Sequence, residues 1–384
     1  MANLVTSAAT PPTTPKTTTG KTLWILCVLL LIATVVVGST SWLVFQKVYG
    51  TVDTVRDTTA PAILDVIAAR DALVQADSAA IDSFQSGEVT LSGPGLEYQN
   101  QLTSASQHLV QAAERSAAGN SSATSSGSQP IQLLEALLES YSSLIGQADA
   151  HTGTPLLGTT DLWSASHLLH AGDSPILTEF NNLMDDQTSA LNDQVAASSM
   201  TTESLLQWVV PIVLIFALLV VTQVFLRRRF RRAINPWLLL ATAALIGLSI
   251  VTSLAIASQH QLENSRDTLN EVVRLSRDQP SSADVRGQQE LGELMEKECA
   301  GANGGCGPTV NKFVAEHKST DNTTPEISDG RITTLNKGFD NSIMNAGENV
   351  NWKYFIPILT GLIFFVFIPF GLWPRIEEYR YRPR

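Results

Sequence analysis

Long apolar stretches alternate with long polar ones along this chain of 384 residues. A helix needs about 20 mainly apolar residues to cross the hydrocarbon core of a bilayer, and its backbone groups must be hydrogen-bonded within the segment. Four stretches meet this requirement and contain no Asp, Glu, Lys, Arg or His: 23–45, 205–226, 236–257 and 354–373. The pattern therefore predicts four transmembrane helices.

The basic residues beside these stretches indicate how the chain is oriented. The short loop between the second and third stretches contains five arginines and no acidic residue: Arg227, Arg228, Arg229, Arg231 and Arg232. The C-terminal tail is also rich in arginine, and basic residues near a span favour the cytosolic side. We therefore expect a multi-pass plasma-membrane protein with both termini in the cytosol.

The spans divide the chain into nine parts. We expect a disordered cytosolic tail (1–21), four spans (22–45, 205–226, 236–257 and 353–374), two external segments (46–204 and 258–352), a basic cytosolic loop (227–235) and a basic cytosolic tail (375–384). Each external segment is expected to form a helical domain, so the predicted fold class is all-α.

Apolar residues recur at helical spacing through the first external segment. Four long helices are expected, one continuing from the first span to about 84, then 96–118, 131–150 and one from 174 into the second span. This order is that of an up-down four-helix bundle. A short extra helix is expected at 162–170, and Pro61 should bend the first helix or open a turn in it.

The second external segment is shorter, and its pattern is less regular. Helices are expected at 259–278, 284–298, 308–318 and 326–348. Cys299 and Cys306 lie close together on the oxidising side of the membrane, which favours a disulfide. A zinc site would need two further ligands, and none is nearby in the sequence.

The external segments are acidic. Residues 46–204 contain 19 acidic and 4 basic residues, which disfavours a nucleic-acid partner. Catalytic and phosphate-binding motifs are missing, so we expect neither an enzyme nor a cofactor. The histidines are scattered; His167 and His170, with His151, could be metal ligands, but ordinary polar residues on a helix surface are favoured, and no metal site is expected.

Arg70 and Asp77 interrupt an otherwise apolar helix stripe in the first external segment. With Arg56 and Arg115, they are the candidate residues for binding a ligand or partner. An arginine fork can bind a carboxylate at two points. The alternative is an ion pair or polar contact between helices that fixes their register.

The cytosolic arginines also have two interpretations. They can act only as topology signals, or they can dock a cytosolic protein. The docking candidates are Arg227, Arg228, Arg229, Arg231, Arg232, Arg380 and Arg382, and the last two alternate with tyrosines.

Two resemblances refine this picture. The stretches TTAPAIL (58–64) and ARDAL (69–73) resemble the first helix of four-helix-bundle chemoreceptor sensor domains, although the signalling coiled coil of those receptors is missing. The four spans, two external segments and the ending LWPRIEEYR (372–380) are similar to an actinobacterial membrane component. That component works with an amino-acid-binding lipoprotein and the soluble Ser/Thr protein kinase G.

The second resemblance implies a non-enzymatic signal relay. An external lipoprotein that binds acidic amino acids would be the outer partner, and a cytosolic Ser/Thr kinase controlling glutamate metabolism the inner one. The residues also allow a direct sensor of acidic amino acids, a structural subunit of an envelope complex, and a homodimer. Membrane lipids are the remaining expected partner.

Overall fold

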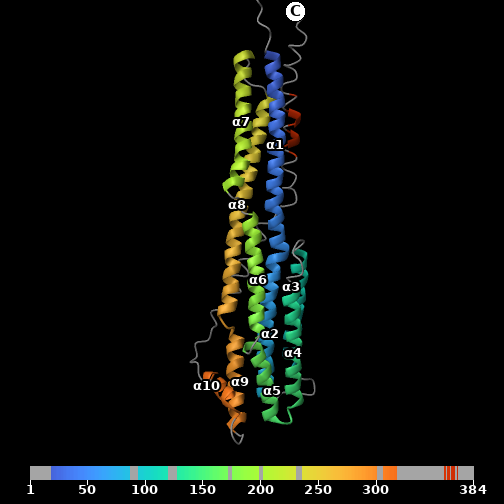
Figure 1. Cartoon of the computed structure of the whole chain (residues 1–384), viewed down its shortest axis with the longest axis vertical. Helices are drawn as coiled ribbons and strands as arrows, with labels where there is room; N and C mark the ends of the chain where they lie inside the picture. The colour runs from blue at the N-terminus through green and yellow to red at the C-terminus, as the bar shows by residue number, and fades with distance from the viewer. Residues whose placement is uncertain are drawn as a thin grey trace, which may run out of the picture. The chain divides into compact units, whose positions relative to one another are not determined.

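Helices account for nearly all of the residues that the structure describes. The computed structural model describes residues 19–86, 94–119, 128–171, 175–198, 202–230, 236–300 and 306–317, with a few positions between 359 and 370 (Figure 1). These ranges contain α1 (Thr19–Thr54), the π-helical η1 (Val55–Thr59), α2 (Ala60–Ser86), α3 (Leu96–Gly119), α4 (Ser128–Ala150), α5 (Pro155–His170), α6 (Ile176–Ser198), α7 (Thr202–Phe230), α8 (Pro236–Asp278), α9 (Ser282–Ala300) and α10 (Pro308–His317). No strand occurs in these ranges, which confirms the all-α class.

The chain divides into two compact units. The apolar unit comprises residues 1–46, 200–256 and 349–384, and the bundle unit comprises 47–199 and 257–348. The two external segments, which we expected to form separate domains, thus lie in a single compact unit. Helices α1 and α8 each contribute residues to both units.

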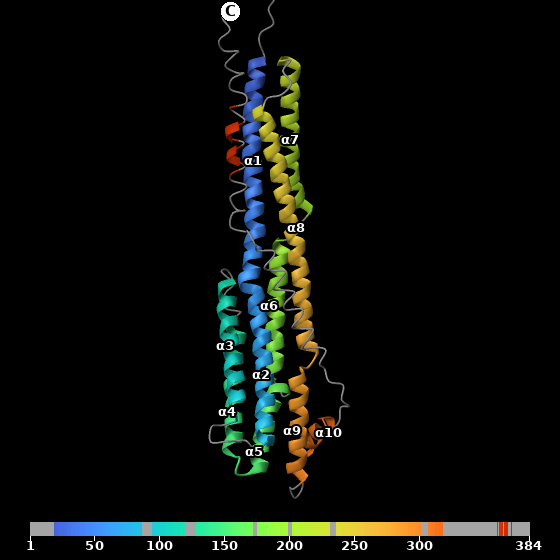
Figure 2. The ribbon, with the colours of Figure 1, turned by 180° about the vertical axis from the view of Figure 1, so that it is seen from behind.

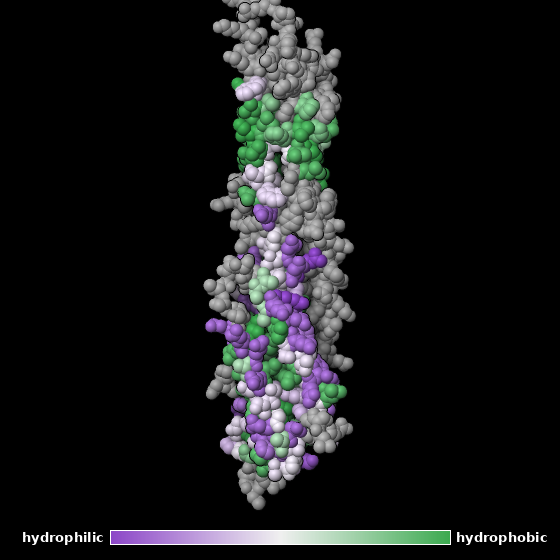
Figure 3. Space-filling view, turned by 90° about the vertical axis from the view of Figure 1, so that its right-hand side faces the viewer, coloured by the Kyte–Doolittle hydropathy of each residue, from purple (hydrophilic) through white to green (hydrophobic). Residues whose placement is uncertain are grey.

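In the apolar unit, α1, α7 and α8 share a small core. Its buried residues are Leu30, Ala33, Val37, Ile215, Leu219, Ala241 and Leu245. Apolar side chains also gather on the outer surface of this unit (Figure 3). Large exposed ones include Trp24, Phe216 and Ile250. Among the described residues, Trp24–Leu43 is the one helical segment long and apolar enough to cross a membrane.

The other predicted spans are less complete in the structure. Val209–Val224 is an apolar helical segment of 16 residues, which is shorter than a full span. Most of 353–374 lies outside the described residues, as does the predicted helix at 326–348. The structure therefore contains an N-terminal apolar helix with the length of a membrane anchor or signal sequence.

Helix α2 is the central element of the bundle unit. It packs against α3, α6 and α9 (Figure 1), and α10 packs on α9 (Figure 2). Its small residues Ala60, Ala69, Ala76 and Ala80 are completely buried. Because alanine side chains take little space, neighbouring helices can pack closely on several sides of α2.

Pro61 affects the chain just before it. A proline has no N–H to donate within a helix, and its ring clashes with the carbonyl four residues earlier. The helix widens into η1 at this point, and the Ala60 N–H bonds to the Val55 carbonyl five residues back. The expected disturbance at Pro61 is therefore a local π-helical turn.

Two details of the bundle unit bear on the sequence predictions. Helix α5 begins at Pro155, seven residues earlier than expected, and Gly158 allows its first turn to approach the end of α4: a Cβ there would lie 3.2 Å from the Ala148 and His151 carbonyl oxygens. Cys299 and Cys306 form the predicted disulfide, with their Cα atoms 5.4 Å apart.

Candidate functional site

A buried carboxylate joins three helices of the bundle unit. Asp77 on α2 exposes only 2% of its surface. It accepts hydrogen bonds of 2.9 Å from the Tyr141 hydroxyl on α4 and the Ser166 hydroxyl on α5. Buried polar groups need such partners, because an unpaired one is costly. Asp77 therefore makes a polar contact between helices, which was the alternative to ligand binding in the sequence analysis.

The network continues to α9, which belongs to the second external segment. The Gln288 amide donates to the Ser166 hydroxyl at 2.9 Å, and His170 Nε2 lies 2.7 Å from Asp284 Oδ1. His170 Nδ1 lies 2.9 Å from the Ser166 carbonyl oxygen. Both ring nitrogens of His170 thus face an oxygen acceptor, which favours the imidazolium form.

Burial and charge both act on this network. Burial raises the pKa of the Asp77 carboxyl, an effect that the nearby His170 and the hydrogen bonds from Tyr141 and Ser166 only partly offset. Burial lowers the pKa of His170, but its hydrogen bond to Asp284 and the charges of Asp77 and Asp284 outweigh this and leave that pKa raised. His170 therefore lies near two carboxyl groups on different helices, and both of them favour the protonated form of its ring.

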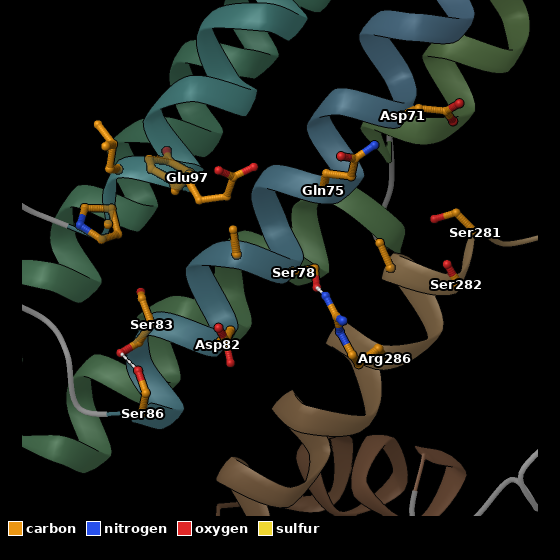
Figure 4. A pocket seen from close by; sticks show the side chains of 16 residues that line it. Asp71, Gln75, Ser78, Asp82, Ser83, Ser86, Glu97, Ser281, Ser282 and Arg286 are labelled. Carbon is orange, nitrogen blue, oxygen red and sulfur yellow. Dashed lines mark hydrogen bonds between the residues drawn. The ribbon is translucent and has the colours of Figure 1, made fainter. Parts of the chain in front are cut away.

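The bundle unit also contains a cavity of about 820 Å³, which none of the side chains of this network lines. It lies between α2, the start of α3 and the start of α9 (Figure 4). Its charged lining residues are Asp71, Asp82, Glu97 and Arg286. Tyr98 also lines it with part of its side chain, but its hydroxyl is buried, and burial and the charge of Asp77 raise the pKa of that hydroxyl.

The other predicted site residues lie apart from Asp77 and its partners. Arg70 is 6% exposed, and its Nη1 lies 3.6 Å from Asp71 Oδ1. The Arg115 guanidinium pairs with Asp65, which joins α3 to α2. Arg56 lies 3.7 Å from Asp57. These three arginines thus contact acidic residues outside the network.

The predicted cytosolic docking residues fall at the end of α7 or outside the described residues. Arg227, Arg228 and Arg229 fall in the last turns of α7, where only the backbone is described. Arg231, Arg232, Arg380 and Arg382 lie outside the described residues. Their docking role remains a prediction.

The histidines differ from the expectation in one case. His170 was expected at a helix surface, but it exposes only 19% of its side chain and belongs to the network. His151 instead pairs with Asp161 at 2.6 Å, and the His167 ring lies against Trp163. Across the described ranges, no group of three or more His, Cys, Asp and Glu side chains is placed to bind a metal ion.

The sequence contained a signal for the residues on α9 that we missed. Asp284 and Gln288 share a stripe with Leu291 and Met295, at spacings of four, three and four residues. They interrupt an apolar stripe in the same way as Asp77 does on α2. The interpretation applied to Asp77 would have identified them.

Comparison with known proteins adds one finding. Residues 51–196 match the family described as the actinobacterial sensor domain. The match covers η1 and α2 to α6 almost completely, and it confirms the sensor-like character expected for the first external segment. No curated protein and no solved structure matches the chain.

Proposed function

We propose that this chain is a non-enzymatic membrane protein that senses a signal outside the cell and passes it across the membrane. The observation that carries the proposal is the sensor-domain match at 51–196, in a chain whose other unit consists of apolar helices. A sensor of this kind needs two packings of its helices with different affinities for the signal.

Three helices of the apolar unit support a multi-pass arrangement, for which the sequence suggests four spans. Helices α1, α7 and α8 bury small and branched apolar residues against each other and expose large apolar residues outward. Soluble proteins rarely expose apolar surface continuously over several helices, whereas lipid tails favour it. The acid-free arginine loop at 227–235 would then lie in the cytosol.

Two helices offer a route for the signal. The last residues of α1 and the second half of α8 belong to the bundle unit, and the remainder of each helix belongs to the apolar unit. A change of packing in the bundle unit would therefore act on helices that continue into the spans. Small shifts of packed helices are a known form of switching.

The partners in this proposal come from the resemblance to the protein kinase G system. A lipoprotein that binds amino acids would deliver the external signal, and a cytosolic Ser/Thr kinase that controls glutamate metabolism would receive it. The arginines of the 227–235 loop supply the charge for contact with the kinase.

Neutralising part of the loop tests the inner partner. We expect replacement of Arg228, Arg231 and Arg232 by glutamine to reduce signal-dependent kinase output at least about 10-fold, because a close charge pair at an interface can contribute about 1.5 kcal/mol or more. The measurement is phosphorylation of the kinase substrate in cells given external amino acids.

The matched control replaces the same three residues by lysine, which keeps the charge and the topology signal. It should retain most of the output. Membrane content is measured for both variants. Full output from the glutamine variant, present at normal levels in the membrane, would refute docking through this loop.

A further inference from the structure

A histidine–aspartate pair joins the end of α5 to the start of α9 (Figure 2). His170 is the last residue of α5, and its Nε2 lies 2.7 Å from Oδ1 of Asp284 in the first turn of α9. Both side chains are largely buried, with 19% and 12% of their surfaces exposed. The pair therefore connects the first external segment to the second through two groups that can gain or lose a proton.

The surroundings of the ring suit its protonated form. Nδ1 lies 2.9 Å from the Ser166 carbonyl oxygen, and Nε2 faces the Asp284 carboxylate. A neutral imidazole has one N–H, so either tautomer would direct a nitrogen lone pair at one of these oxygens. The Gln288 amide nitrogen, 3.2 Å from Nδ1, offsets only part of this repulsion, because it also donates to the Ser166 hydroxyl.

The charged groups that face the ring are both acidic. Asp284 approaches it from α9, and Asp77 from α2, with Oδ2 4.0 Å from Nδ1. From α4, the Tyr141 hydroxyl acts on the ring through its hydrogen bond to Asp77, and no described residue of α6 forms an ion pair with it. Burial lowers the pKa of His170, but the hydrogen bond to Asp284 and the two negative charges outweigh it and leave that pKa raised.

Other contacts keep α9 in the bundle when this pair is lost. Gly287 packs so closely on α2 that a Cβ there would lie 3.2 Å from Ser78 Cα, and Leu291 and Met295 are buried. Loss of the pair would therefore loosen the start of α9 without unfolding the helix. Residues 279–281 connect this start to α8, which continues into the apolar unit.

We propose that the α5–α9 contact is a pH-sensitive switch between the two external segments. Protonated His170 holds the start of α9 against α5, and loss of the proton releases it. The switch would make the bundle unit respond to the acidity of its surroundings. This inference goes beyond the proposed function, because it needs neither the lipoprotein nor the kinase.

The raised pKa of His170 fixes the direction of the response. A group that binds its proton more tightly in the closed contact stabilises that contact fully below its pKa in the open state. This stabilisation is lost as the pH rises through the pKa of the closed state. The start of α9 should therefore open least below about pH 6.5 and more at alkaline pH. Asp77, whose pKa burial also raises, acts in the same direction and stays in place in every variant below.

Hydrogen exchange of the full-length protein in lipid nanodiscs, compared at about pH 6 and about pH 9, tests the switch. Protection factors of peptides from the start of α9 are measured, because they correct for the direct effect of pH on exchange. We expect the wild-type protection factor to fall about 10-fold or more between these pH values, since hydrogen bonds to charged groups are stronger than neutral ones.

His170→Gln separates the switch from a purely structural contact. Glutamine keeps a polar side chain but does not titrate, so the protection factor of α9 should become nearly independent of pH. Asp284→Asn should also reduce the dependence, because it removes the carboxylate that favours the protonated ring. His151→Gln is the matched control, since His151 pairs with Asp161 at 2.6 Å between the end of α4 and α5, and it should keep the wild-type dependence.

Three results would overturn the proposal. They are a wild-type protection factor that does not fall with pH, a fall of the same size in His170→Gln, and loss of the fall in His151→Gln. The proposed sensor function would survive each of them, because it is tested by kinase output and not by the protection of α9.

Discussion

Replacing Asp77 by alanine is expected to increase local opening of the bundle unit by roughly 100-fold, the largest effect of any single substitution considered. The change leaves the Tyr141 and Ser166 hydroxyls buried without their acceptor. Each unsatisfied group costs about 1–3 kcal/mol. Burial of the Asp77 charge is itself unfavourable, so its removal offsets part of this cost and leaves a net loss of about 3 kcal/mol.

Hydrogen exchange of the full-length protein, followed by mass spectrometry on peptides from α2, α4 and α5, measures this opening. Asp82→Ala is the control on the same helix, since Asp82 is exposed, and it should shift stability by less than about 0.5 kcal/mol. Asp77→Asn keeps an acceptor oxygen and should fall between the two. Exchange in Asp77→Ala that matches the control would show that the network does not hold these helices together.

The second large effect is expected at the contact between α2 and α9. Gly287 packs so closely that a Cβ there would lie 3.2 Å from Ser78 Cα and 3.2 Å from Ser78 Cβ. Gly287→Leu should therefore push α9 away from α2 and strain the bonds of Asp284 and Gln288. Overpacking costs about 1–3 kcal/mol, and the better helix propensity of leucine returns only about 0.8 kcal/mol.

We expect a net loss of about 2 kcal/mol, seen as roughly 30-fold faster exchange in α9. Gly146→Leu makes the same change on α4, where a Cβ would have open space, and it should be neutral or slightly stabilising. If both variants exchange alike, the two external segments do not pack through Gly287.

The helices of the bundle unit could be predicted because their apolar periodicity is long and regular. The predicted 96–118 and 131–150 lie close to α3 (Leu96–Gly119) and α4 (Ser128–Ala150). The association of α9 with α2 could not be predicted, because helical periodicity identifies an apolar stripe but not the helix that covers it. The close contact of Gly287 with Ser78 becomes visible only in three dimensions.

The candidate site could be predicted only in part, because the sequence shows which residue interrupts an apolar stripe but not which residue faces it. Asp77 stood out because it interrupts an apolar stripe, and it is buried. Its partner His170 did not stand out, because its burial depends on α9 supplying Asp284 from 114 residues away in the sequence. Arg70 was singled out because the first external segment has few basic residues. The cavity is instead lined by Arg286, which was not singled out because basic residues are more frequent in the second external segment.

The arrangement across the membrane is the claim on which the sensor account depends. Labelling of single cysteines in intact cells by a membrane-impermeant maleimide tests it, in a Cys27→Ala background where Cys299 and Cys306 stay protected in their disulfide. The account predicts that Ser140→Cys, on the exposed face of α4, is labelled in intact cells, whereas Ala233→Cys in the arginine loop is labelled only after permeabilisation. Labelling of Ala233→Cys in intact cells, or protection of Ser140→Cys, would contradict it.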